Sequence, residues 1–505
     1  MFKIGFLISL LFILQAAYAL PLTEALFKQN KILKRATCAD DYSVKNLPGL
    51  DKMDPKFVPE MHAGYIQAEE NVDEDYFFWK FSKNQTESAS SDRLILWFNG
   101  GPGCSSMAGA LAENGPLTLN DNDEVVYSPG TWIEEGDLVF IDQPGGVGFS
   151  DSNDYSSELK DIAANMMTFL KNYFEVFPED KAKDLYLSGE SYAGQYIPYF
   201  GAKILAEETD INLKGLLIFN GYIYPDVQQS ALFEFGVENN IISQSDADEA
   251  QDEIQECIQT YESNQQLWAS VIKEIEANGE YEGENDFETD DNKVESYECI
   301  QLLNEFLLAT YDTSKPEDEL CINVYDFRLR DSSLCGSNSF PPNHQQINDF
   351  LNSATIDEAL NLKTAKNWSD CDSGTVGENL VNYYSYPAFF KLPYILSKIP
   401  ILIAAGENDI ICNIKGLEKM VSVLTWGDKL SPGFSSDIEY ANYGVDGTTY
   451  GTVKQEGNLM FAGISNASHM APYSQPIGSR ALIDIFFGDF IKNGSNYVAP
   501  SHGDF

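Results

Sequence analysis

Residues 184–194 read DLYLSGESYAG, and this stretch decides the fold. An apolar run, Leu185 to Leu187, leads into Gly-Glu-Ser-Tyr-Ala-Gly, and helical apolar spacing follows from Tyr192 to Glu208. A strand, a tight turn and a helix in this order are typical of a nucleophile elbow, whose small residues let a serine hydroxyl project above the sheet. Ala193 stands where glycine is usual, which still keeps the volume small. We therefore predict that Ser191 is a catalytic nucleophile.

Short apolar runs recur on both sides of this stretch, with helical patterns such as residues 159–177 between them. The runs are residues 94–98, 138–141, 216–219, 401–404 and 459–464. Continuous apolar runs are typical of parallel strands covered on both faces. We expect an α/β protein of the α/β-hydrolase fold, with a mostly parallel central sheet flanked by helices.

The strand and helix rhythm stops between about residues 222 and 375, where the sequence is polar and rich in cysteine. We expect an inserted, helical, disulfide-stapled cap subdomain there, with an acidic surface loop at 279–297. It would divide the core into 36–221 and 376–492 and leave a tail at 493–505.

The charge balance excludes some functions. The chain has 505 residues, of which 32 are basic and 78 acidic, so its formal net charge is −46. This charge repels phosphate backbones and anionic lipids, so we expect no nucleic-acid partner. With 43% hydrophobic residues the chain can bury a large core, which excludes wholesale disorder.

The N-terminus has the pattern of a secretory signal. Lys3 precedes an apolar run and a small-x-small site at Ala17 to Ala19, so residues 1–19 are interpreted as a removed signal peptide. The pair Lys34-Arg35 resembles a kexin-type site that would release residues 20–35 as a propeptide, although such pairs also occur by chance. No later run is apolar enough to span a bilayer. We expect a soluble, secreted or vacuolar protein of the secretory pathway.

Four N-x-Ser/Thr sequons fit this route as glycosylation acceptors. They begin at Asn84, Asn367, Asn466 and Asn493.

A serine nucleophile needs an imidazole to take its proton and a carboxylate to orient the imidazole. Of the four histidines, His469 alone lies late in the chain beyond an apolar strand, as the order serine, acid, histidine requires. For the acid, the strand at 401–404 opens into a polar loop at its carboxyl end. Asp409 in that loop is the predicted acid, with Glu407 in reserve.

The reaction also needs N–H donors for an oxyanion. The strand at 94–98 is followed by Asn-Gly-Gly-Pro-Gly-Cys-Ser-Ser, a glycine-rich turn that can supply one donor, while the residue after the nucleophile supplies the other. We assign these donors to Gly101 and Tyr192. No Gly-Lys-Ser/Thr follows, so a phosphate-binding loop is disfavoured, and no cysteine pair has zinc-site spacing. We expect no metal and no cofactor.

Four ordered blocks resemble the signature blocks of the serine carboxypeptidases. They are WFNGGPGCSS from Trp97, GESYAG from Gly189, GENDIICN from Gly406 and ASHMAP from Ala467. Other segments, such as MHAG from Met61, most resemble the fungal subfamily that processes pheromone and killer-toxin precursors, a carboxypeptidase D type related to carboxypeptidase Y. Membrane anchors are usual in that subfamily, but we expect no membrane span in the mature chain.

The resemblance implies a set of binding residues. Asn99, the Gly100 amide, Glu113 and Glu190 would bind the free C-terminal carboxylate of a substrate, the two glutamates sharing a proton. Two neighbouring carboxyls can accept an anion only if one stays protonated, so acid conditions should favour cleavage. The alternative interpretation is that Glu113 is a solvated surface residue without a binding role.

The resemblance also implies roles for several sulfur-containing residues. Cys104 would pair with Cys371, and Cys412 would remain a free thiol beside the leaving-residue pocket with Met470. The four cysteines of the insertion would form two bridges with three open connectivities, and Cys38 has no assigned partner. The four are Cys257, Cys299, Cys321 and Cys335.

The expected function is a serine-type carboxypeptidase that releases C-terminal residues at acidic pH through an acyl-enzyme. The resemblance implies a preference for the C-terminal Lys or Arg that kexin-type cleavage leaves. Alternatives are a broad-specificity vacuolar carboxypeptidase, an esterase or acyltransferase on the same scaffold, and a catalytically silent binding protein. The expected partners are peptide or protein C-termini.

Overall fold

The computed structural model describes residues 38–500, apart from gaps at 70–73, 85–91, 154, 208–209, 281–294, 333–334, 337–339, 364–366, 373–374, 382–384, 428, 430 and 495. The predicted signal peptide at 1–19, the candidate propeptide at 20–35, most of the acidic loop and the end of the tail lie outside the described residues. Within the described part of the chain, no helix combines the length and the apolar character needed to cross a membrane.

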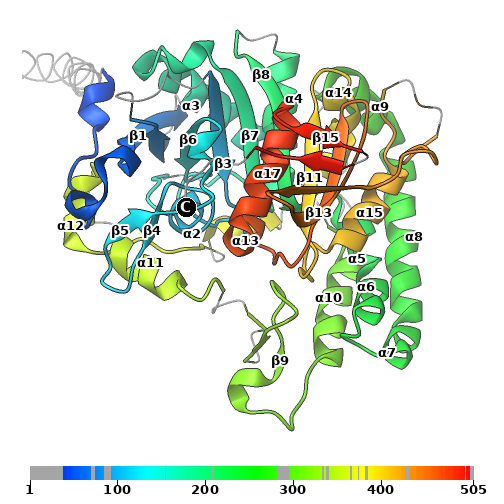
Figure 1. Cartoon of the computed structure of the whole chain (residues 1–505). Coiled ribbons are helices and arrows are strands. Elements are labelled where there is room, and N and C mark those ends of the chain that lie inside the picture. The colour runs from blue at the N-terminus through cyan, green and yellow to red at the C-terminus, as the bar shows by residue number, and fades with distance from the viewer. Residues whose placement is uncertain are drawn as a thin grey trace, which may run out of the picture.

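A sheet of twelve strands, counted over the described residues, forms the centre of the molecule (Figure 1). Its middle strands are parallel and follow the order β6-β3-β7-β8-β11-β14. Their bounds are β3 Arg93–Phe98, β6 Asp137–Ile141, β7 Asp184–Ser191, β8 Leu213–Gly221, β11 Ile401–Gly406 and β14 Leu459–Ile464. Each contains one of the predicted apolar runs, and the expected α/β-hydrolase fold is confirmed.

Both edges of the sheet contain antiparallel pairs, although β12 and β16 pair in parallel. On one edge β2 pairs with β6 and β1, and on the other β14 continues into β13 and β12, with β16 and β15 beyond. Their bounds are β1 Glu60–Glu69, β2 Glu74–Ser82, β12 Ala441–Val445, β13 Thr448–Glu456, β15 Ile491–Asn493 and β16 Asn496–Val498. β1 and β2 are mostly buried, whereas β12, β13, β15 and β16 are largely half-buried or exposed, so their apolar pattern is weaker than that of the buried parallel strands.

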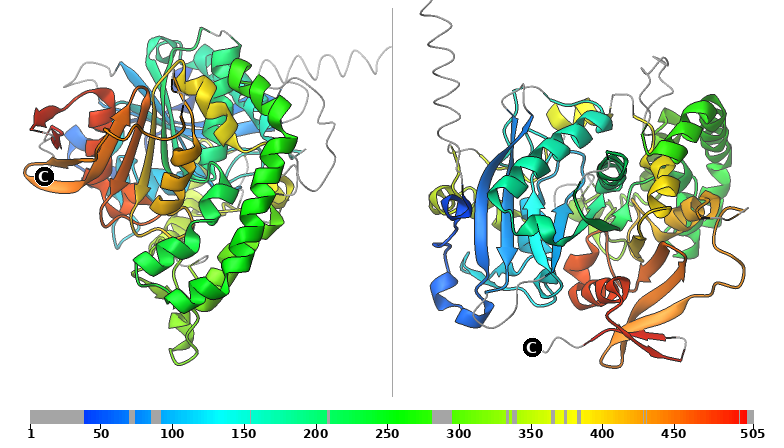
Figure 2. Two further views of the ribbon diagram at one scale, coloured as in Figure 1. Left: turned by 90° about the vertical axis from the view of Figure 1, so that its right-hand side faces the viewer. Right: turned by 90° about the horizontal axis from the view of Figure 1, so that it is seen from above.

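Helices cover both faces of the sheet and create two separate cores. Successive side chains of a strand point to opposite faces, so Leu96 and Phe98 of β3 join one core while Ile95 and Trp97 join the other. The first core lies under helices α3 and α4, and the second under α2 and α17, as the two views in Figure 2 allow the reader to follow. The bounds are α2 Ser106–Ala112, α3 Leu159–Val176, α4 Ala193–Ala206 and α17 Pro476–Phe487.

The described part of residues 225–331, between β8 and β11, is mostly helical and forms a lobe at one side of the sheet, coloured green to yellow-green in Figures 1 and 2. Cys257 of α8 bonds to Cys299 of α10, and Cys321 bonds to Cys335 beside the short strands β9 and β10. The two bridges select one of the three connectivities that the sequence left open. The bounds are α5 Pro225–Gln229, α6 Leu232–Glu238, α7 Gln244–Glu249, α8 Gln251–Leu267, α9 Ala269–Asn278, α10 Tyr297–Ala309, β9 Cys321–Ile322 and β10 Arg330–Asp331. The domain boundaries given above stay a prediction.

Candidate active site

The turn after β7 has the geometry of a nucleophile elbow. Ser191 ends the strand with a φ of 59°, a left-handed conformation that is uncommon for a residue with a side chain. Helix α4 begins two residues later at Ala193. A Cβ on Gly189 would lie 2.1 Å from the Phe98 carbonyl oxygen and 3.0 Å from the Ala193 methyl group. The turn is therefore too tight for larger residues, although it accepts alanine at its last position.

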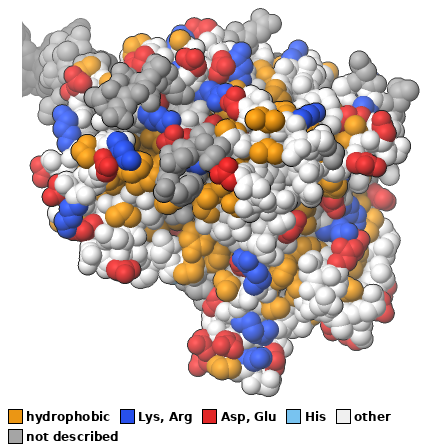
Figure 3. All heavy atoms as spheres, viewed as in Figure 1, with side chains coloured by type: hydrophobic (Ala, Val, Ile, Leu, Met, Phe, Trp, Pro, Cys, Tyr) orange, Lys and Arg blue, Asp and Glu red, His pale blue; other side chains and the backbone are white. Residues whose placement is uncertain are grey.

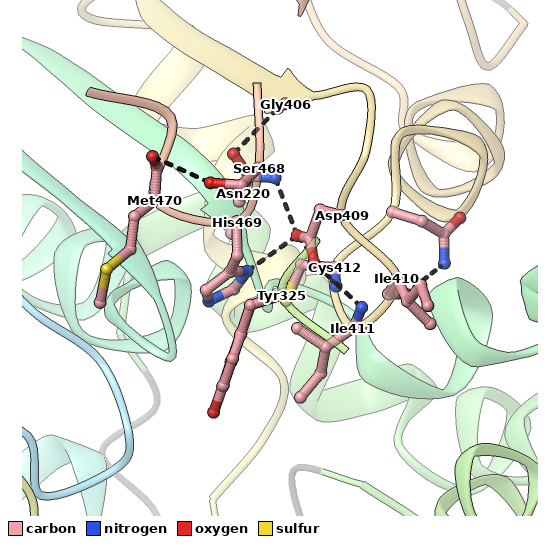
Figure 4. A network of polar contacts seen from close by, with 12 residues as sticks. Asn220, Tyr325, Gly406, Asp409, Ile410, Ile411, Cys412, Ser468, His469 and Met470 are labelled. Carbon is pink, nitrogen blue, oxygen red and sulfur yellow. Dashed lines mark hydrogen bonds and ion pairs between the residues drawn. The ribbon is translucent and has the colours of Figure 1, made fainter. Parts of the chain in front are cut away.

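His469 and Asp409 lie in direct contact. The Nδ1 atom of His469 is 2.8 Å from Oδ2 of Asp409, and both side chains are buried, with exposures of 3% and 0% (Figure 4). His469 follows β14 and Asp409 follows β11, its parallel neighbour, so the carboxyl ends of the two strands bring them together. The contact orients the ring and leaves Nε2 as the proton acceptor.

Asp409 accepts three further hydrogen bonds, which hold its carboxylate in place. Its donors are the side-chain amide of Asn220 at 2.8 Å and the backbone amides of Ile411 and Cys412 at 3.0 and 3.2 Å (Figure 4). Asn220, at the end of β8, also accepts a hydrogen bond of 3.0 Å from the Gly406 amide. Both ends of this amide are thus fixed between the strands that flank the acid.

Tyr325, from the segment between β8 and β11, fixes the other side of the histidine. Its carbonyl accepts the His469 amide at 2.7 Å, and the centroids of the two rings are 5.2 Å apart. A residue of the lobe therefore contributes to the orientation of the imidazole.

Ser191 lies on the strand pair next to this contact. Its carbonyl accepts the Tyr222 amide at 2.8 Å, directly after β8, and it shares a cavity wall with Ile411 and Cys412. Among the described residues no hydrogen bond joins the Ser191 hydroxyl to His469. The structure therefore brings acid and imidazole into contact and places the serine in the adjoining cavity, where substrate binding can tighten the last contact.

Asn99, Glu113 and Glu190 form a buried cluster under the elbow. The Asn99 side-chain amide donates to Oε1 of Glu113 at 3.0 Å and to Oε1 of Glu190 at 3.2 Å. The Trp97 indole in turn donates to Asn99 at 2.8 Å, which fixes the orientation of the amide. Exposures of 2–3% exclude the solvated alternative for Glu113.

The two glutamates share one environment and influence each other. Burial raises the pKa of Glu113, and burial followed by the charge of Glu113 raises the pKa of Glu190 well above its ordinary value. The Oε2 atom of each is buried without a donor among the described groups, yet the two carboxyls lie within hydrogen-bond reach of each other. A single shared proton satisfies both atoms.

The glycine-rich turn after β3 packs against the elbow. A Cβ on Gly100 would lie 2.4 Å from the Tyr192 amide nitrogen, so only glycine allows this approach. Neither Gly101, with a φ of 107°, nor Tyr192 has an acceptor for its N–H among the described residues. Both residues line the cavity beside Ser191, and their role as oxyanion donors stays a prediction.

The sulfur-containing residues are placed as follows. Cys104 of the turn bonds to Cys371, and Cys38 and Cys412 are free, the first exposed and the second buried. Burial, and then the charge of Asp409, raises the pKa of Cys412 well above its ordinary value, so the thiol stays protonated. Cys412 lines the cavity beside Ser191, whereas Met470 does not; in Figure 4 the two lie on opposite sides of His469.

One cluster among the described residues has metal-ligand composition. Ligand-type atoms of Asp409, Cys412 and His469 lie within 4.8 Å of one another. Asp409 already accepts three N–H donors, however, and the Cys412 thiol is held in its protonated form. A cation would have to compete with these donors, so the cluster fits an orienting role better than a metal site.

The four sequon asparagines, Asn84, Asn367, Asn466 and Asn493, are all exposed. Glycosylation at these positions stays a prediction.

Sequence reasoning missed three polar residues that the structure places around the site. Asn220 holds Asp409, Glu295 lines the cavity beside Ser191, and the charge of Asp370 acts on both Glu113 and Glu190. Asn220 could have been suspected because it ends an apolar strand. The other two stand in polar segments, where no pattern distinguishes them from surface residues.

Comparisons with known proteins agree with this geometry. A family profile described as serine carboxypeptidase matches residues 48–489. Pheromone-processing carboxypeptidase KEX1 of Debaryomyces hansenii is 38% identical over 94% of this chain and 66% of its own length, and KEX1 of Ogataea parapolymorpha is 38% identical over 92% and 73%. The chain therefore spans about two thirds to three quarters of these relatives.

Among solved structures, Kex1Δp, a prohormone-processing carboxypeptidase from Saccharomyces cerevisiae, superposes with a TM-score of 0.81 at 34% identity. The match covers 92% of this chain and 100% of that chain.

Proposed function

Because this chain belongs to the serine carboxypeptidase family and is a serine-type hydrolase, we propose that it removes basic residues from the free C-termini of peptides, through an acyl-enzyme and with an acidic optimum. The observation that carries this proposal is the buried cluster of Asn99, Glu113 and Glu190 directly beneath the elbow. An esterase does not need such a group, because its substrate has no terminal carboxylate at that position.

The geometry supports a two-step reaction. The Ser191 hydroxyl attacks the last peptide carbonyl while His469 takes its proton, and the Gly101 and Tyr192 amides stabilise the oxyanion. The carbon–nitrogen bond then breaks, and the leaving amine receives the proton from His469. Water deprotonated by the same imidazole hydrolyses the ester and returns the proton to the serine. Asp409 orients the ring and stabilises its charged form in both steps.

The proposed acid optimum follows from the glutamate pair. A terminal carboxylate binds when at least one of the two carboxyls carries a proton, and their raised pKa values extend this condition above the ordinary glutamate range. As the pH rises further, both ionise and repel the substrate carboxylate. We expect the KM for free-acid peptides to rise with pH, and that for amidated peptides to stay flat.

Preference for a terminal Lys or Arg is supported by Asp370. Besides burial, the charge of Asp370 raises the pKa values of both Glu113 and Glu190, so the three carboxyls lie near one another. The Asp370 carbonyl accepts a hydrogen bond of 2.7 Å from the Ser105 amide, which fixes the backbone at this position. Burial raises the pKa of Asp370 to about 6, with His344 acting in the opposite direction. A leaving residue held by its carboxylate would place a cationic side chain near this acid. The relatives are described as pheromone-processing and prohormone-processing carboxypeptidases, which is consistent with such substrates.

A peptide series tests this proposal. Free-acid peptides that differ only in the last residue, each with its C-terminally amidated twin, would be followed by mass spectrometry from pH 4 to 8. We expect release of one residue from the free acids, fastest for Lys and Arg, with loss of this preference in Asp370→Asn. Equal cleavage of acid and amide twins would favour the esterase or acyltransferase alternative, and full activity in Ser191→Ala would refute the mechanism.

The compartment also belongs to this proposal. Three disulfides among the described residues are expected of a protein that folds in the oxidising secretory pathway. Loss of secretion after deletion of residues 1–19 would support that route.

A further inference from the structure

A cavity of about 210 Å³ opens beside the nucleophile. One wall is the active-site turn with Gly101, Ser191 and Tyr192. Asn99, Glu113 and Glu190 are not among its lining residues. A substrate whose terminal carboxylate is bound by those three groups has its leaving residue between them and Ser191. This arrangement favours the side chain of the penultimate residue, on the acyl side of the broken bond, as the occupant of the cavity. Cys412 would then line the pocket of that residue and not the leaving-residue pocket that the resemblance implied.

Among the residues that line the cavity, Glu295 is the one carboxylate. The Tyr222 hydroxyl donates a hydrogen bond to its Oε1 atom, and Gln229 donates at 3.3 Å to the same hydroxyl, which directs the tyrosine proton toward the glutamate. The Oε2 atom has no donor among the described residues. One oxygen of Glu295 is thus fixed by the protein while the other remains free for a ligand.

The remaining lining residues suit the stem of a long side chain. Ile300 of α10 and Ile411 and Cys412 of the loop after β11 are apolar, and they line the same cavity as Ser191 and Glu295. Lysine and arginine bury such stems along apolar surface and keep only their charged ends among polar groups. The volume is many times the roughly 10–15 Å³ that admits one water.

We propose that Glu295 selects substrates with Lys or Arg as the penultimate residue, by pairing with the cationic end of that side chain in this cavity. The inference rests on the proposed function and deepens it: the enzyme would recognise two consecutive basic residues, with Asp370 acting on the last and Glu295 on the one before it.

The protonation of Glu295 gives this pairing its own pH dependence. Burial raises the pKa of Glu295 to about 8, the Tyr222 hydrogen bond opposes this rise, and the charge of Asp226 adds to it. The other titratable groups around it, Tyr192 and Cys412, stay neutral because burial raises their pKa values too. Glu295 therefore ionises as the pH rises toward 8, and selectivity for a penultimate cation should increase in that direction. The glutamate pair under the elbow has the opposite dependence.

The test uses two peptides that share the same last residue and differ only in the penultimate one, Lys against norleucine, which has a similar length and no charge. The quantity compared is the ratio of their kcat/KM values in the full chain. We expect the wild type to favour Lys by about tenfold or more, in the range of a close charge pair, and the ratio to grow from pH 5 to 8. In Glu295→Gln, which keeps an acceptor for Tyr222, the ratio should fall to about one while norleucine turnover is unchanged.

Two controls keep the outcomes distinct. Glu298→Gln removes the same charge from the first turn of α10, outside the cavity lining, and should leave the ratio at its wild-type value. Glu295→Lys should reverse the preference toward a penultimate Glu over Gln. An unchanged Lys to norleucine ratio in Glu295→Gln overturns the proposal, as does a wild-type ratio that stays flat or falls with rising pH. Failure of the wild type to release a residue from either peptide would instead refute the proposed function.

Discussion

Asn220 illustrates how a single side chain can position a catalytic acid. Its amide nitrogen donates to Asp409 and its amide oxygen accepts from Gly406, so it connects β8 to the loop after β11. A hydrogen bond to a charged group contributes roughly 1.5–3 kcal/mol. Its loss should allow Asp409 to rotate away from His469.

We therefore predict that Asn220→Ala lowers kcat by about 10- to 100-fold and changes KM little, because the group orients the acid and does not touch substrate. Steady-state kinetics on one free-acid peptide would measure both parameters. Asn408→Ala, a buried asparagine in the same loop as Asp409 with an unpartnered amide nitrogen, is the matched control and should retain its kcat. An Asn220→Ala enzyme with wild-type kcat would contradict the positioning role.

At the residue scale, the predictable part of the site was the part with a local pattern. Ser191 stands in a turn that is packed too closely to accept large neighbouring residues. Asp409 and His469 each follow a buried strand. Glu295 and Asp370 come from irregular segments that only the folded chain brings to the site. Single polar residues in such segments carry no periodicity, so sequence reasoning could not identify them.

At the scale of elements, the turn after β3 depends on a distant segment for its support. Cys104 is bonded to Cys371, 267 residues away in sequence, and the Asp372 amide donates to the Gly103 carbonyl at 2.8 Å. A Cβ on Gly103 would lie 2.4 Å from the Asp372 carbonyl oxygen, so the two segments are in close contact. The disulfide and this hydrogen bond thus fix the loop that carries the Gly101 amide to the segment around Cys371.

We predict that Cys104→Ser combined with Cys371→Ser lowers both the unfolding temperature and kcat. Loss of a native disulfide typically costs about 2–5 kcal/mol, and here the freed loop also carries Gly101, the proposed oxyanion donor. Thermal unfolding and peptide turnover would be measured on the same preparation. The pair Cys257→Ser and Cys299→Ser is the control, because that bridge joins two helices of the lobe and should affect stability more than kcat. A larger loss of kcat in this control pair would contradict the assignment.

The elements themselves were predictable to different degrees. The central parallel strands and helices α3 and α4 appeared as continuous or regularly spaced apolar residues, because they are buried on both faces or along a wide stripe. The edge strands β12, β13, β15 and β16 did not, since most of their residues are half-buried or exposed. The sequence predicts two disulfide bonds among the four cysteines of the lobe. Which cysteines pair depends on which helices pack together.

At the scale of the whole molecule, some of the carboxyl groups lie on the surface and others are buried. On the face shown in Figure 3, acidic side chains are spread among basic and apolar ones. Several other carboxyls are buried and have raised pKa values, about 7 for Asp226 and about 6 for Asp484, in both cases chiefly through burial. Asp180 differs: burial raises its pKa, but the charges of Lys80 and Lys183 outweigh this effect and lower it overall.

These shifts predict how stability depends on pH. A buried acid with a raised pKa keeps its proton when folded and loses it when unfolded, so it stabilises the fold fully below its unfolded pKa of about 4, and this contribution is lost as the pH rises through its folded value. Asp180 contributes in the opposite sense, and its contribution is lost only below about pH 4.

We predict a maximum in the unfolding temperature near pH 4–5 and a fall on the order of 5 °C by pH 8, since 1 kcal/mol corresponds to about 2–4 °C in a large domain. Differential scanning fluorimetry at constant ionic strength would measure it. Asp226→Asn, which keeps an acceptor for the Ser296 amide, should flatten the curve between pH 4 and 7. Stability that increases steadily from pH 5 to 8 would be inconsistent with this assignment.

The central claim is that Ser191 becomes a nucleophile through His469 and Asp409. Mapping the residue that reacts with diisopropyl fluorophosphate, by peptide mass spectrometry with timed quenching, tests it most directly. The account predicts a single label on Ser191, none in Ser191→Ala, and labelling slowed on the order of 10³-fold or more in His469→Ala. A label on another residue, or labelling of His469→Ala at the wild-type rate, would contradict it.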